Sequence, residues 1–105
     1  MVIGPAEAPL VHTRWPIFAT ELAAALRAHG DDSLIDQVKN LRVVQTCGCG
    51  DDFCQSFSTA PRPVGGYGKG HRTICLDPPW PGYLNLDVVD DDIVNVEVLY
   101  RSPLC

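Results

Sequence analysis

The sequence predicts an α+β domain, with one or two N-terminal helices packed on a four- to five-stranded, mainly antiparallel sheet. Three observations predict this class. Apolar residues first recur at helical spacing, from about residue 41 the spacing falls to two, and the helices precede the strands instead of alternating with them. Such an order favours a sheet that is covered on one face by the helices.

The composition is that of one small globular domain. The chain has 105 residues, of which 46% are hydrophobic and 20% charged. A chain of this length buries roughly two-thirds of its unfolded surface, so it needs neither a disulfide nor a metal in order to fold. We expect residues 1–105 to form a single domain, with an irregular arm (1–14), a helical part (15–40) and a β-meander (41–101).

Two helices are expected in the helical part. The first covers residues 16–29, because Pro16 suits a first helical turn and Gly30 a C-terminal stop. Its apolar stripe consists of Phe18, Leu22, Ala25, Leu26 and His29. The second covers about residues 33–39, where Asp32 or Ser33 can cap and Ser33 with Asp36 matches the capping-box spacing.

Five strands are expected in the meander, at residues 41–47, 53–59, 71–77, 83–90 and 93–101. The last two alternate strictly between apolar and polar residues. The alternation predicts that one strand buries Leu84, Leu86 and Val88 and the other buries Val94, Val96 and Val98. The acidic residues 90–92 then form a tight turn, which is a better interpretation of them than a calcium site formed with Asp87.

The stretch "TCGCGDDFC" places three cysteines close together. If Cys49 and Cys54 pair across a four-residue loop, Cys47 lies on the same face as Cys49, and the three thiols form a cluster. Such a cluster suits zinc, for which His71 or Cys75 on the third strand is the candidate fourth ligand.

Two other interpretations of these cysteines stay open. Leu41 and Val43 share the face of Cys47, which favours small buried thiols that only pack. Alternatively, Cys49 or Cys54 is a reactive thiol or half of a disulfide, with His71 as the best available base. The spacing alone does not decide between packing, metal binding and thiol chemistry.

The stretch "RPVGGYGKGHR" is rich in glycine and carries Arg62, Lys69, His71 and Arg72. It is not a phosphate-binding P-loop, because no Ser or Thr follows its Gly-Lys pair and no helix begins there. We expect a flexible hairpin connection which, if functional, binds an anion or an acidic partner.

The stretch "DPPWPGY" holds Trp80 and Tyr83 in a proline-stiffened connection. Exposed Trp and Tyr are frequent anchors of protein interfaces. The alternative is that Trp80 folds back to cover an edge of the core.

Charge and targeting features narrow the classes of partner. The net charge of −5 argues against a general nucleic-acid binder, because phosphate neutralisation requires a basic surface. No secretory signal and no apolar run near the ~18 residues of a membrane span is apparent, so a cytoplasmic location without membrane association is expected. Five cysteines in a reducing compartment favour free thiols, metal ligands or transient redox pairs.

Two segments carry a resemblance to other proteins. "LRVVQTCGCG" together with "LDVVDDDIVNVEVLYR" resembles a group of small uncharacterised bacterial proteins that have a C-G-C-G strand end and a terminal β-hairpin. The resemblance covers about residues 41–101. It implies the strand layout given above and no particular activity.

The function expected from these features is that of a small, acidic, non-enzymatic module that binds or regulates a protein partner. Its expected contact residues are Arg62, Lys69, Arg72, Trp80 and Tyr83. One alternative is a zinc-stabilised domain that uses the cysteine hairpin. The other is a thiol-based redox or transfer enzyme. The oligomeric state is not predicted.

Overall fold

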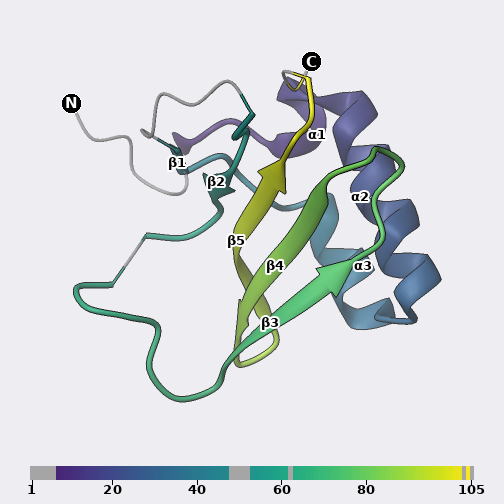
Figure 1. The fold of residues 1–105 in the computed structure, drawn as a ribbon. Coiled ribbons are helices and arrows are strands. Elements are labelled where there is room, and N and C mark those ends of the chain that lie inside the picture. Colours follow the sequence, from purple (N-terminus) through teal and green to yellow (C-terminus); the bar gives the residue numbers. More distant parts are fainter. Residues whose placement is uncertain (1–6, 48–52, 62, 103, 105) are drawn as a thin grey trace.

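The computed structural model describes residues 7–47, 53–61, 63–102 and 104, and it has the predicted α+β class (Figure 1). Three helices come first, α1 (Val11–Arg14), α2 (Pro16–His29) and α3 (Asp32–Val38). Five strands follow, β1 (Gln45–Thr46), β2 (Phe57–Ser58), β3 (His71–Leu76), β4 (Tyr83–Val89) and β5 (Asp92–Leu99).

The strands form one antiparallel sheet in the order β1-β2-β5-β4-β3. The helices lie on one side of this sheet, and the long connection between β2 and β3 extends on the other side (Figure 1). We call the side away from the helices the outer face. Because side chains alternate along a strand, every second residue of β4 belongs to that face.

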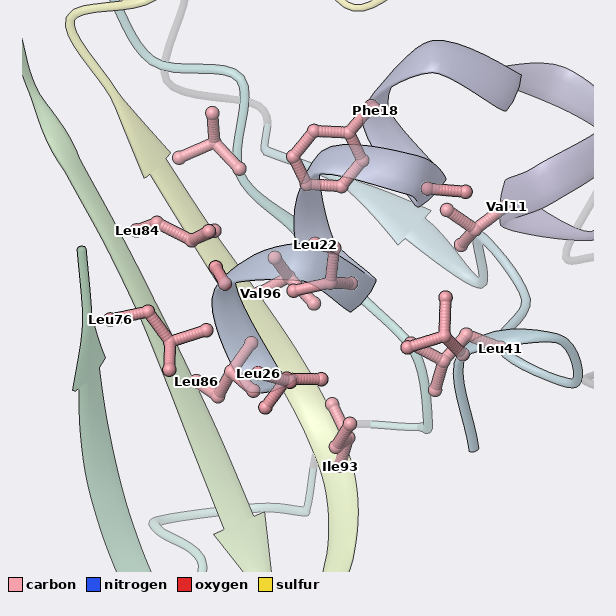
Figure 2. Packing of buried hydrophobic residues seen from close by; sticks show 14 of the residues in the cluster. Val11, Phe18, Leu22, Leu26, Leu41, Leu76, Leu84, Leu86, Ile93 and Val96 are labelled. Atoms are coloured by element: carbon pink, nitrogen blue, oxygen red, sulfur yellow. The ribbon is translucent and has the colours of Figure 1, made fainter. Parts of the chain in front are cut away.

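Helix α2 supplies most of the helical side of the core. It begins with Pro16 at its first turn and ends at Gly30, whose left-handed φ of 90° lets the N–H of the next residue, Asp31, reach the Leu26 carbonyl oxygen at 3.2 Å. Both ends are as predicted. Figure 2 shows the buried side chains of α2 facing those of the sheet, among them Phe18, Leu22, Leu26, Leu76, Leu84, Leu86 and Val96.

The N-terminal arm is more ordered than predicted, because residues 11–14 form the short helix α1. Val11 is fully buried, and its N–H donates to the Leu41 carbonyl oxygen at 2.8 Å. Leu10 forms an isolated antiparallel bridge with Arg42. The backbone of residues 41–43 therefore pairs with the arm and not with the sheet. Of the strand predicted at 41–47, only the two residues of β1 remain in the sheet.

Helix α3 begins one residue earlier than predicted, and the capping-box spacing does not mark its start. The residue before its first turn is Asp31, whose side chain caps no backbone N–H. The Asp31 carboxylate is instead 2.7 Å from Nδ1 of His29. This local contact with His29 therefore competes with the cap.

The β4–β5 hairpin has the predicted tight turn but not the predicted strict alternation. Asp87 lies opposite Asn95, whereas Val88 lies opposite Ile93, so Val94 faces no residue of β4 and forms a bulge. Between the turn and the bulge, the residues of β5 therefore face the opposite side from the one that strict alternation predicts. Ile93 is buried at 4% exposure and Val94 is only half-buried, so the prediction that Val94 shares the core face was wrong.

Candidate functional site

Two of the three clustered cysteines lie within the described residues. Cys47 is half-buried, and its N–H donates to the Ser56 carbonyl oxygen at 2.9 Å. Cys54 is also half-buried and bridges to Leu99 at the end of β5. Cys49 lies outside the described residues, so the predicted three-thiol cluster stays a prediction.

The structure does not bring the proposed fourth ligands to these cysteines. His71 and Cys75 lie on β3, which is at the opposite edge of the sheet from β1. Four interstrand spacings, about 19 Å, separate β1 from β3, and three spacings, about 14 Å, separate β3 from Cys54, which bridges to β5; both are far beyond the reach of one metal ion. Within the described residues, no group of three or more His, Cys, Asp or Glu side chains is placed to hold a metal.

His71 belongs instead to a hydrogen-bond network on the outer face. Its Nε2 is 2.8 Å from Oδ1 of Asp87, and the same oxygen accepts from the Thr73 hydroxyl at 3.1 Å. Oδ2 of Asp87 accepts from the Asn95 amide at 3.2 Å. The Ser58 hydroxyl donates to Oδ1 of Asn95 at 3.3 Å, so the network crosses four strands from β2 to β3.

A pocket of about 250 Å³ opens onto this network beneath the glycine-rich connection. Its lining residues are Pro63, Gly65, Gly66, Tyr67, Asp87 and Asn95. The Tyr67 ring lies 4.9 Å from the His71 ring, centre to centre. We call this the loop pocket.

The loop pocket presents a carboxylate, whereas the basic side chains of the connection are those expected, if the connection is functional, to bind an anion or an acidic partner. Arg72 is turned to the exposed Asp91, 3.4 Å away, and Lys69 is exposed in the connection. Arg62 lies outside the described residues. The cause of the difference is strand parity, which directs Asp87 to the outer face beneath the loop.

Trp80 lies against the core. The structure therefore has the arrangement in which Trp80 folds back over an edge of the core, and not the exposed anchor. Its ring is 6.4 Å from that of Phe18, and its indole N–H donates to the Leu99 carbonyl oxygen at 3.2 Å. The guanidinium of Arg101 covers it at 5.2 Å. The side chain is half-buried by these contacts and does not project as an exposed anchor.

Three other aromatic side chains do form an exposed cluster. The Phe53 and Tyr100 rings are stacked with centres 5.2 Å apart, and the Tyr100 and Tyr83 rings are 5.9 Å apart. Their exposed fractions are 43%, 55% and 56% for Phe53, Tyr100 and Tyr83. We call these three residues the aromatic ridge.

The backbone around the aromatic ridge is specifically arranged. Tyr100 has a φ of 58°, in the left-handed region, and its N–H donates to the Phe53 carbonyl oxygen at 2.7 Å. Gly82 lies so close to the Leu99 carbonyl oxygen and to Tyr100 that any side chain at position 82 would clash. Glycine thus allows the start of β4 to approach the end of β5, which brings Tyr83 beside Tyr100.

Of the three ridge residues, the sequence predicts only Tyr83 as a contact residue. Tyr100 could not have been placed from the turn alone, because a turn at residues 90–91 with regular pairing sets Tyr83 opposite Val98, and only the bulge moves Tyr83 opposite Leu99 and next to Tyr100. Phe53 joins by a tertiary contact for which local sequence has no signal. The pairing of Asp87 with Asn95 could not be predicted without the bulge, which shifts the register of the hairpin by one residue.

No protein-family model, curated protein or solved structure matches this chain. The resemblance to small bacterial proteins therefore stays a prediction. No helix in the described ranges is long and apolar enough to cross a membrane.

Proposed function

We propose that the protein is a non-enzymatic binding module, and that the aromatic ridge receives an apolar side chain of a protein partner. The observation that carries this proposal is the exposure of three adjoining rings. In the described residues, the large apolar side chains that are exposed are Ile17, Phe53, Val64, Tyr83 and Tyr100, and three of these five form the ridge.

The residue types also support a protein contact. Tyr and Phe bring large contact area with few rotatable bonds, so that little entropy is lost when a partner immobilises them. The two tyrosines add hydroxyl groups that can pair with a partner's backbone. A ridge that joins three separate segments is, moreover, held in place before a partner arrives, which lowers the cost of binding.

Site-specific cross-linking tests the proposal. A photoreactive benzophenone amino acid at position 83 should yield a covalent adduct with one defined protein in an extract of the source cells. The same amino acid at position 17 is the control, since Ile17 is 65% exposed but lies on α2, in the helical layer. Equal adducts from both positions, or none from position 83, would contradict the proposal.

Affinity measurement on the identified partner completes the test. Tyr83→Thr should weaken its binding about tenfold, the effect of losing a moderate interface anchor. Ile17→Thr removes a comparable amount of exposed apolar surface and should leave the dissociation constant unchanged. Both variants should unfold cooperatively in urea and lose less than about 1 kcal/mol of stability, so both are folded during the binding measurement.

A further inference from the structure

The aromatic ridge and the loop pocket lie in line along β4. Tyr83, Asn85 and Asp87 alternate with the buried Leu84 and Leu86, so all three belong to the outer face. Four residues of an extended strand span about 13 Å. A segment of a partner that is extended along β4 and anchored at the ridge therefore reaches Asp87 with the side chain four residues further on.

The outer face between the two sites is acidic. Glu97 accepts a hydrogen bond from the Asn85 amide at 2.8 Å, and Asp87 has the three neutral or imidazole donors described above. Among the described ion pairs, neither carboxylate has a lysine or arginine partner. The chain as a whole carries a net charge of −5, which favours a cationic partner in general.

The loop pocket has the chemistry and the size for one cationic group. A carboxylate offers about four acceptor positions, and three of those on Asp87 are occupied within the protein. Tyr67 adds an aromatic ring to the pocket wall, and aromatic faces attract ammonium and guanidinium groups. A volume of about 250 Å³ admits the end of a lysine or arginine side chain but not a second peptide segment.

We propose that the partner presents an extended basic segment, with an apolar residue on the aromatic ridge and, four residues away, a lysine or arginine in the loop pocket. This inference rests on the proposed function, since it assigns the chemistry of the partner at the same surface. Asp87 is the residue that selects the cation, and Glu97 lies beside the path between the two sites.

Synthetic peptides test this spacing directly. The probe is a seven-residue peptide with tryptophan at its second position, lysine at its sixth, and serine or threonine elsewhere, with both ends capped. Titration into ¹⁵N-labelled protein should shift the amide signals of Tyr83 and Tyr100 together with the side-chain amide signal of Asn95. Moving the lysine to the fourth position, or replacing it with glutamate, should weaken binding about tenfold.

Matched variants assign the effect to the pocket. Asp87→Asn preserves the shape of the side chain and should weaken the lysine peptide about tenfold, while its affinity for the glutamate peptide does not fall. Asp36→Asn removes one charge from the exposed side of α3 and should bind both peptides as the wild type does. Overlay of the amide spectra establishes that each variant is folded.

The outcomes separate the two proposals. Shifts at the ridge that do not depend on the position of the lysine, or on Asp87, would overturn the basic-segment inference and leave the protein-binding proposal standing. No shift at the ridge with any peptide, combined with no adduct from position 83, would overturn both. Ridge signals that move on dilution of the protein alone would also overturn the inference, because the occupant would then be a second copy of the chain.

Discussion

Tyr100 combines an unfavourable backbone conformation with an exposed aromatic side chain. A left-handed φ costs a residue with a Cβ about 1 kcal/mol, and here the φ is 58°. The cost is met by the hydrogen bond from Tyr100 to Phe53 and by the stacking of their rings. A conformation of this kind is kept where the position of the side chain matters, which agrees with the proposed role of the ridge.

The turn between β4 and β5 offers a direct test of backbone strain. Asp90 and Asp91 both have positive φ, at 50° and 68°, as in a type I′ turn, in which the second position favours glycine. Asp91→Gly should therefore raise the free energy of unfolding by about 0.5 kcal/mol. The lost contact with Arg72 is 3.4 Å long and exposed, so it offsets little of this gain.

Urea unfolding followed by circular dichroism measures the change. Asp92→Gly is the control, since Asp92 is the first residue of β5 and has no positive φ. Glycine there should lower stability by about 0.5–1 kcal/mol. Equal effects of the two substitutions would refute the assignment of strain to position 91.

At the scale of elements, the bulge in β5 decides which side chains reach which face. Without it, Val94 would point to the core and Ile93 away from it. Because of the bulge, Asn95 lies opposite Asp87 on the outer face while Ile93 still enters the core. The same strand thus supplies one side chain to the polar network and another to the core.

Deletion of Val94 tests this account. It should give a regular hairpin with Ile93 still buried and Asn95 still on the outer face. The expected loss is about 1 kcal/mol, because the Val94 carbonyl oxygen no longer accepts from Thr59 N–H.

The matched control is deletion of Val96, which exchanges the faces of the residues before it and directs Asn95 toward the core. That variant should not unfold cooperatively. Cooperative thermal unfolding, followed by circular dichroism, distinguishes the two deletions. Loss of cooperativity on deleting Val94 would show that the bulge is required for folding.

The two types of element differ in how far the sequence could predict them. Helix α2 and the β4–β5 hairpin were predicted because their signals are local, in the form of periodicity, a proline, a glycine and an acidic turn. The bridge of Leu10 to Arg42 and the bulge at Val94 were not. The first depends on residues far apart in the chain, and the second on a choice between Ile93 and Val94, which are almost equally apolar.

The candidate site was less predictable for the same reason. Tyr83 and His71 were singled out by their residue types, but their neighbours come from other strands. His71 was considered a metal ligand or a base, whereas the register of β3 with β4 places it beside Asp87. Side chains that are brought together by strand order and register are visible only once the sheet is built.

At the scale of the whole molecule, residues that pack on the core should determine stability, whereas residues of the outer face should determine binding. Trp80 covers one end of the core together with Arg101, whose guanidinium is 2.5 Å from Glu21 on α2. We expect Trp80→Ala to lower the free energy of unfolding by about 2 kcal/mol. Truncation of a half-buried ring destabilises a protein less than truncation of a fully buried ring, because less apolar contact is removed. Tyr83→Thr should cost less than about 1 kcal/mol.

The variant that is less stable should bind the peptide more tightly than the other. At a temperature where both are folded, Trp80→Ala should bind the lysine peptide like the wild type and Tyr83→Thr should not. Urea unfolding and peptide titration supply the two measurements. A weaker peptide affinity for Trp80→Ala in a fully folded sample would place Trp80 in the binding surface after all.

The alternation along β4 has a practical consequence. Leu84, Leu86 and Val88 face the helices, and Tyr83, Asn85 and Asp87 face outward, so two independent sets of positions are interleaved in seven residues. A combinatorial library confined to the outward set would leave every core contact of the strand intact. The domain is in this respect a scaffold, on which new specificities can be selected without redesigning the fold.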